Sequence, residues 1–146
     1  MNYSNVSSTY KETKIKTASQ GQLIIMLYDG AVKNLNLAIE SLEVNSEKKD
    51  PGKIEKIGKS ILKAEEIITE LMVSIDFEQG GEIAKNLFSL YTWFNRELLE
   101  ANITQDIKRV SVVRDMLVEL RNTWNEIALK HNEPVNREVV GLDITG

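Results

Sequence analysis

Apolar residues recur every three or four positions along four stretches of the chain, which is the spacing of one face of an α-helix. The stretches cover about residues 19–44, 53–76, 82–102 and 105–130. Segments rich in turn-forming residues separate them, and no stretch shows the clear alternating pattern of a β-strand. The pattern predicts an all-α protein, an antiparallel up-and-down four-helix bundle with a flexible N-terminal arm and a flexible C-terminal tail.

Local signals place the ends of these helices. Ser19 can cap the first helix, and Gln22, three residues later, completes a capping box. The segment from Asn45 to Gly52 and the Gly80-Gly81 pair are interpreted as turns. Thr104 is the expected N-cap of the fourth helix.

One apolar row on each helix is expected to form the core, and the row of the second helix is the most regular. The expected core positions are Ile25, Tyr28, Val32, Leu35, Ile39 and Leu42; Ile54, Ile57, Ile61, Ala64, Ile68, Leu71 and Ile75; Ile83, Leu87, Leu90, Phe94, Leu98 and Ala101; and Val110, Val113, Leu117, Leu120, Trp124, Ile127 and Ala128. The opposite face of the second helix is charged and is interpreted as an ordinary solvated surface.

The first and third helices carry more apolar residues than one row can use. On the first helix, Leu23, Met26, Gly30 and Leu37 form a second, narrower strip. Methionine suits an adaptable contact surface, and glycine lets another backbone come close. A surplus of this kind predicts a second packing partner, from the same chain or from another one.

The termini are expected to lie outside the bundle. Residues 1–16 are interpreted as a flexible arm, residues 17–131 as the bundle, and residues 132–146 as a flexible or extended tail. Within the arm, Tyr10 is either an exposed loop aromatic or an anchor that folds back onto the bundle.

Composition narrows the class of protein. The 146 residues are 42% hydrophobic and 27% charged, which is typical of one soluble globular domain. The net charge of −4 and the absence of a basic stripe argue against nucleic acid as the main partner. The longest apolar run, Leu23 to Tyr28, is too short for a membrane span, and no signal peptide is visible. The lack of cysteine excludes disulfides and fits a cytoplasmic protein.

Residues for catalysis or metal binding are scarce. A di-iron bundle needs Glu-x-x-His on two helices, but His131 is the single histidine and has Ala128 three residues before it. No Walker lysine follows Gly80-Gly81. We therefore expect neither a metal, a cofactor nor an enzyme. Asn86, Asn95 and Arg96 either make local hydrogen bonds or stand at the rim of the apolar side, or they fix the register of a bound peptide, and the sequence leaves these interpretations open.

Specific blocks of sequence resemble the flagellar secretion chaperone FliS family. The blocks are Tyr10, Thr17-Ala18-Ser19, Leu23-Ile24, Met26-Leu-Tyr-Asp-Gly-Ala31, Lys63-Ala-Glu-Glu-Ile-Ile68 with Glu70-Leu71, Gly81-Glu-Ile-Ala84 with Asn86-Leu87 and Leu90-Tyr91, Leu99-Glu-Ala-Asn102, and Glu119-Leu-Arg121 with Trp124. They extend over roughly residues 10–128. Gln20 departs from the proline that the family usually has after Thr-Ala-Ser.

The resemblance implies a cytoplasmic chaperone that binds the C-terminal segment of flagellin, prevents its premature polymerisation and keeps it competent for type III export. It also implies that the arm occupies part of the binding surface when no client is present. An interaction module that regulates another flagellar protein is the alternative. Other flagellar export proteins are further expected partners, and the client-free protein can also pair with a second copy. The expected client-binding residues are Tyr10, Leu23, Met26, Leu27, Tyr28, Gly30, Leu37, Asn86, Leu87, Leu90 and Tyr91.

Overall fold

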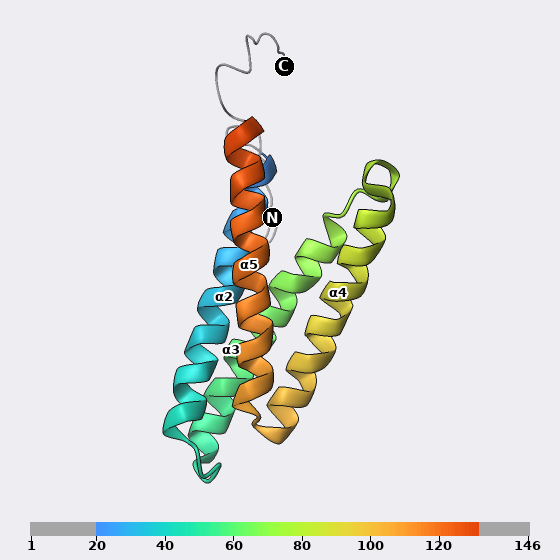
Figure 1. Cartoon of the computed structure of the whole chain (residues 1–146). Helices are drawn as coiled ribbons and strands as arrows, with labels where there is room; N and C mark the ends of the chain where they lie inside the picture. Colours follow the sequence, from blue (N-terminus) through green and yellow to red (C-terminus); the bar gives the residue numbers. More distant parts are fainter. Residues whose placement is uncertain (1–19, 132–146) are drawn as a thin grey trace, which may run out of the picture. The chain divides into compact units, whose positions relative to one another are not determined.

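Four α-helices make up most of the part of the chain that the computed structural model describes, residues 20–131 (Figure 1). They are α2 (Gln20–Val44), α3 (Pro51–Val73), α4 (Phe77–Thr104) and α5 (Ile107–His131). Within residues 20–131 there is no strand. The predicted all-α, four-helix fold is confirmed. Tyr10, the expected arm and tail, and the Ser19 cap lie outside the described residues.

The chain divides into two compact units. One is Leu27–Leu120, which contains α3, α4, most of α2 and the first half of α5. The described part of the other comprises residues 20–26 and 121–131. In the Leu27–Leu120 unit, α3 and α4 pack along one another as an antiparallel pair (Figure 1).

Aspartate side chains cap three of the four helices. The carboxylate of Asp50 accepts a hydrogen bond from the backbone N–H of Gly52, with Pro51 in the first turn. Asp76 accepts from the N–H groups of Glu78 and Gln79. These caps satisfy backbone donors that have no partner inside the helix. The expected start of the second helix at residue 53 is therefore two residues late, because the Asp-Pro step opens the helix.

The fourth helix also begins differently from the prediction. Its cap is Asp106, whose carboxylate accepts from the N–H groups of Lys108 and Arg109. Thr104, the expected cap, is the last residue of α4, and its hydroxyl donates to the carbonyl of Glu100. Gln105 ends α4 in the left-handed conformation at φ 55° and ψ 47°.

A kink separates the first turn of α4 from the rest of the helix. Gly81 has φ 55° and ψ −126°, a conformation that L side chains rarely adopt. The predicted break at Gly80-Gly81 is present, but Asp76 builds one capped turn before it. Gly80 lies directly over Ala84, since a Cβ added to it would be 2.7 Å from the Ala84 Cβ.

The buried residues largely follow the predicted rows. The buried apolar residues are Ile25, Tyr28, Ala31, Leu35, Ala38, Ile39 and Leu42 on α2; Ile57, Ile61, Ala64, Ile68 and Leu71 on α3; Ala84, Tyr91, Phe94, Leu98 and Ala101 on α4; and Val110, Val113, Leu117 and Ala128 on α5.

Two of the expected core positions are exposed. On α4, Ile83 is 71% exposed, because Ala84 takes the inward position beneath Gly80. On α5, Ile127 is also exposed. Half-buried side chains stand at further expected core positions: Val32, Ile54, Ile75, Leu87, Leu90, Leu120 and Trp124.

A buried pair of tyrosines joins α2 to α4. The hydroxyl groups of Tyr28 and Tyr91 are hydrogen-bonded to each other, and their ring centroids are 6.5 Å apart. Phe94 packs against Tyr91 from the next turn of α4. Burial, and then the neighbouring Tyr28, raise the pKa of the Tyr91 hydroxyl, so it stays protonated. The pair fixes how α2 and α4 pack inside the Leu27–Leu120 unit.

Replacing Tyr28 with phenylalanine removes the hydrogen bond that the buried Tyr91 hydroxyl makes. We expect the free energy of unfolding to fall by about 1–3 kcal/mol, the usual effect of leaving a buried polar group unsatisfied. Adding Tyr91→Phe should recover part of that loss, because no polar group is then left in the pair. Urea denaturation of both variants measures this, and additive losses would show that the two hydroxyls act independently.

Candidate functional site

The outer face of the α3–α4 pair retains large apolar side chains that the core does not bury. On α3, Leu62 is 54% exposed, and on α4, Leu99 is 53% exposed. Further along α4, Phe88 and Ile103 are exposed as well. Single exposed leucines are common on protein surfaces, but a row that follows two packed helices is typical of a contact surface.

Helix geometry explains why these residues point outward. An α-helix turns about 100° per residue, so Leu62 cannot share the face of the buried Ile61. On α4, Phe88, Leu99 and Ile103 fall within about a quarter of the helix circumference, beside the buried row. We call these three residues the outer α4 row.

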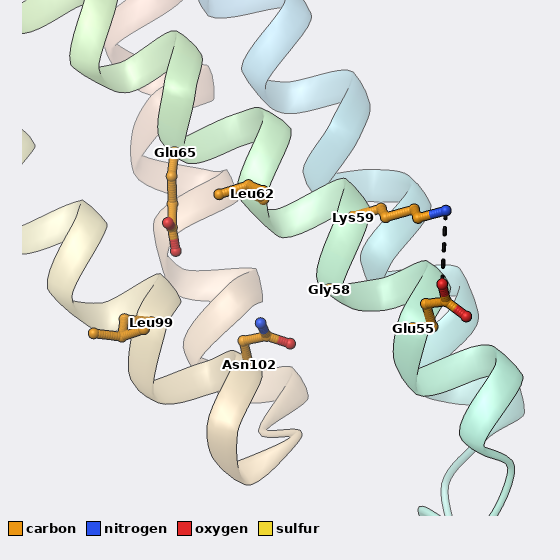
Figure 2. A pocket seen from close by; sticks show the side chains of 7 residues that line it. All are labelled: Glu55, Gly58, Lys59, Leu62, Glu65, Leu99 and Asn102. Atoms are coloured by element: carbon orange, nitrogen blue, oxygen red, sulfur yellow. Dashed lines mark ion pairs between the residues drawn. The ribbon is translucent and has the colours of Figure 1, made fainter.

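An open pocket of about 330 Å³ lies where these two faces meet. Figure 2 shows Leu62 and Glu65 on α3 and Leu99 and Asn102 on α4 around the space between the two helices. We call this pocket the α3–α4 groove; its lining residues are Glu55, Gly58, Lys59, Leu62, Glu65, Leu99 and Asn102.

Gly58 makes the groove deeper where the helices approach. A Cβ added to Gly58 would lie 3.7 Å from the amide atoms of Asn102, which is an ordinary van der Waals distance. The glycine is therefore not required by close packing. Its lack of a side chain leaves space beside Leu62 and Asn102 that a partner's side chain can enter.

Glu65 is the charged group that faces into the groove. Partial burial, and then the neighbouring Glu66, raise the pKa of its carboxyl group. Glu55 and Lys59, the other charged lining residues, pair with each other at 3.8 Å on the exposed side of α3 (Figure 2). Along residues 20–131, no cation pairs with the Glu65 carboxylate.

Beyond the groove, Asn95 and Thr69 tie the two helices together. The amide nitrogen of Asn95 donates to the Thr69 hydroxyl over 3.2 Å. This supports a local structural role for Asn95, one of the interpretations that the sequence left open. Asn86 and Arg96 are exposed.

An aromatic pair lies at the turn between α3 and α4. Phe77 and Phe88 pack edge to face with ring centroids 5.8 Å apart, and both are partly exposed. Val73 and Ile83, near the same turn in the chain, are exposed too. Exposed apolar side chains therefore occur at both ends of the α3–α4 pair.

A second hollow, of about 360 Å³, lies beside the loop after α2 and the start of α5, and its lining includes Leu42, Lys48 and Ile107. Lys48 donates to the carbonyl of Thr104 over 3.2 Å, and the Asn45 side chain accepts from the N–H of Asp50. The polar groups of this hollow make structural contacts between neighbouring turns.

The residues that the sequence analysis predicted to bind the client differ in how far they are buried. Tyr28 and Tyr91 are buried and hydrogen-bonded to each other. Met26, Leu37 and Asn86 are exposed, whereas Leu23, Leu27, Gly30, Leu87 and Leu90 are half-buried. Leu23 and Met26 lie in the unit that includes residues 20–26 and 121–131, whereas the other described candidates lie in the Leu27–Leu120 unit.

Gly30 faces a side chain of its own chain. A Cβ added to Gly30 would lie 3.2 Å from the Cδ1 atom of Ile67 on α3, which is a tight contact. The close approach that the sequence indicated at Gly30 therefore includes packing of α2 against α3.

The α3–α4 groove was not identified from the sequence. Leu62 follows the core position Ile61 and precedes Lys63, and charged residues occupy most of the outer face of α3, so this face resembled an ordinary solvated surface. The available signal was a leucine within a face that otherwise carries Glu55, Lys59 and Glu66. Its relation to Leu99 depends on how α3 packs against α4, which periodicity does not give.

The described helices show neither a metal site nor a membrane crossing. Across residues 20–131, no cluster of three or more His, Cys, Asp or Glu side chains could hold a metal ion. In the same range, no helix is both long and apolar enough to traverse a bilayer.

Comparison with known proteins identifies relatives along most of the chain. The family model described as flagellar protein FliS matches residues 2–131. The flagellar secretion chaperone FliS of Salmonella typhimurium is 37% identical over 120 residues, 82% of this chain and 84% of the relative. The chaperone of the same name from Escherichia coli is 35% identical over 119 residues, 81% of this chain and 82% of the relative. That of Bacillus subtilis is 26% identical over 122 residues, 84% of this chain and 85% of the relative.

Replacing Gly58 with alanine should stabilise the protein, because the added Cβ fits beside Asn102 and alanine favours a helix interior. We expect the free energy of unfolding to rise by about 0.5–1 kcal/mol. Gly30→Ala is the matched control, and its gain should be smaller because its Cβ meets Ile67. Chemical denaturation measures both variants, and a destabilised Gly58→Ala protein would show that the groove wall is tighter than described.

Proposed function

The chain belongs to the flagellar protein FliS family, and from this premise we propose that it is an export chaperone for flagellin. In this proposal it binds the C-terminal segment of flagellin in the bacterial cytosol and prevents that segment from polymerising before export. The related proteins are named flagellar secretion chaperones, which supports a role in binding rather than in catalysis.

The exposed apolar surface of the α3–α4 pair is the observation that carries the proposal. An amphipathic helix binds a groove of this kind through apolar side chains at positions i, i+3 or i+4, and i+7. Leu62 and Leu99 provide the apolar walls, and Gly58 leaves room for an entering side chain. These features support the proposal that a helical client segment binds in the groove.

The outer α4 row indicates the size of the client segment. Phe88 and Ile103 are fifteen residues apart, which corresponds to about 22 Å along a helix. A client helix of about four turns could follow this row. Ordering a disordered segment costs roughly 2–5 kcal/mol or more, so contact over such a length is needed for firm binding.

The strip on α2 remains a second proposed contact. Leu37 is exposed in the Leu27–Leu120 unit, and Met26 is exposed in the other unit. Pairing with a second copy in the absence of client also remains a prediction, since uncovered apolar rows favour self-association.

Isothermal titration calorimetry with the C-terminal segment of the flagellin encoded in the same genome tests the proposal. We expect one-to-one binding, and a gain in helix content of the segment by circular dichroism. Leu62→Gln and Leu99→Gln should each weaken binding about five- to tenfold, because each leucine buries its remaining apolar surface against the client. Their thermal unfolding should change little, since both side chains are already half exposed.

Two further variants make the test specific. Leu129→Gln changes an exposed leucine that does not line the groove and should leave the affinity unchanged. Leu37→Gln reports separately on the α2 strip. Absence of binding by the unaltered protein at micromolar concentrations would refute the flagellin proposal and favour regulation of another flagellar protein.

A further inference from the structure

The α3–α4 groove combines apolar walls with one carboxylate, that of Glu65, which pairs with no cationic side chain among the described residues. Glu65 stands one turn after Leu62 on α3, and its side chain extends into the space beside Leu99 (Figure 2). The groove's lysine, Lys59, is engaged by Glu55. Glu97, which lies two residues before Leu99 on α4, pairs with Arg109 of α5. The charge that the groove offers to a partner is therefore negative and centred on Glu65.

Covering the groove changes the surroundings of this carboxylate. In the free protein, water reaches Glu65 through the open side of the pocket, and its partial burial already disfavours the charged form. A helix lying across Leu62 and Leu99 would remove that water. A carboxylate sealed under an apolar side chain loses its hydration without compensation, whereas a cationic side chain restores the lost interactions.

We propose that Glu65 selects the helix that occupies the α3–α4 groove by pairing with a lysine or arginine of that helix. The inference rests on the proposed binding of a flagellar client and adds the chemistry of the segment that binds here. The segment carries apolar residues against Leu62 and Leu99 and a basic residue three or four positions from one of them, on the same helix face.

This arrangement gives specificity as well as affinity. A segment with an apolar residue opposite Glu65 would bury an unpaired charge, so the groove discriminates against it. Arginine suits the position well, because its planar guanidinium can donate two parallel hydrogen bonds to one carboxylate. The apolar contacts alone would accept a wide range of amphipathic helices.

The decisive experiment is a double-mutant cycle between Glu65 and the basic residues of the client. The probe is the synthetic C-terminal segment of the flagellin from the same genome, together with versions in which each lysine or arginine is replaced singly by glutamine. We expect Glu65→Gln to weaken binding of the unaltered segment by about ten- to a hundredfold, as for loss of one member of a desolvated charge pair. Among the segments with a single lysine or arginine replaced by glutamine, we expect one to bind the Glu65→Gln protein as tightly as the unaltered segment binds that same protein.

Controls separate this effect from folding and from general electrostatics. Glu43→Gln removes the same charge from an exposed carboxylate on α2 that does not line the α3–α4 groove, so the affinity for the segment should stay within about twofold. Glu65→Gln is nearly isosteric and removes a partly desolvated charge, so its unfolding temperature should be unchanged or higher. Glu65→Lys should bind the unaltered segment weakly and recover affinity with a segment in which the coupled basic residue is glutamate.

The outcomes distinguish this inference from the proposed function. Equal affinity of Glu65→Gln and the unaltered protein, or strictly additive effects throughout the cycle, would overturn the inference and leave the proposed function intact. A segment that keeps its affinity after all its basic residues are replaced would overturn it too. Lack of binding by the unaltered chaperone would count against the proposed function itself.

Discussion

The geometry of the α-helix sets the main constraint on this structure, because a helix in a small protein can bury only one face. On α3 that face consists of one unbroken row, and the partner row of α4 packs against the same interior. Apolar residues on the opposite side of each helix are turned toward the surface by the helical rotation. Leu62 and Leu99 are therefore exposed because the inward positions beside them are already occupied.

This constraint links folding to function in the Leu27–Leu120 unit. The buried rows and the Tyr28–Tyr91 pair hold the helices together, and the outer face of α3 and α4 takes no part in these contacts. The outer face can then carry apolar residues whose burial occurs on binding rather than on folding. The proposed chaperone function would need this separation, because the contact surface must remain open while the fold itself stays stable. In our proposal, Glu65 adds the requirement for a basic residue to a surface that would otherwise accept many helices.

The helices themselves were predicted from local sequence more accurately than the residues that cap them. The four helices, the break at Gly81 and most inward positions follow from periodicity and from the residues between the helices. The helix starts were predicted less well, because the aspartates at positions 50 and 76 were assigned to turns or to the preceding helix. Each of them stands where a carboxylate can accept from the free N–H groups of the next helix. Asp106 does the same for α5, although Thr104 carries an equally plausible capping hydroxyl.

The sequence by itself determined the all-α fold, the order of the helices and the family, since these depend on spacing along one chain and on specific blocks of residues. It also indicated a surplus of apolar residues, but not where that surplus gathers. Tertiary structure decided that Tyr28 and Tyr91 are buried together, that Gly30 packs against Ile67, and that Leu62, Glu65 and Leu99 share one groove. Residues on different helices become neighbours only through the register in which those helices pack. That register depends on side-chain contacts between helices, which the periodicity of each helix does not contain.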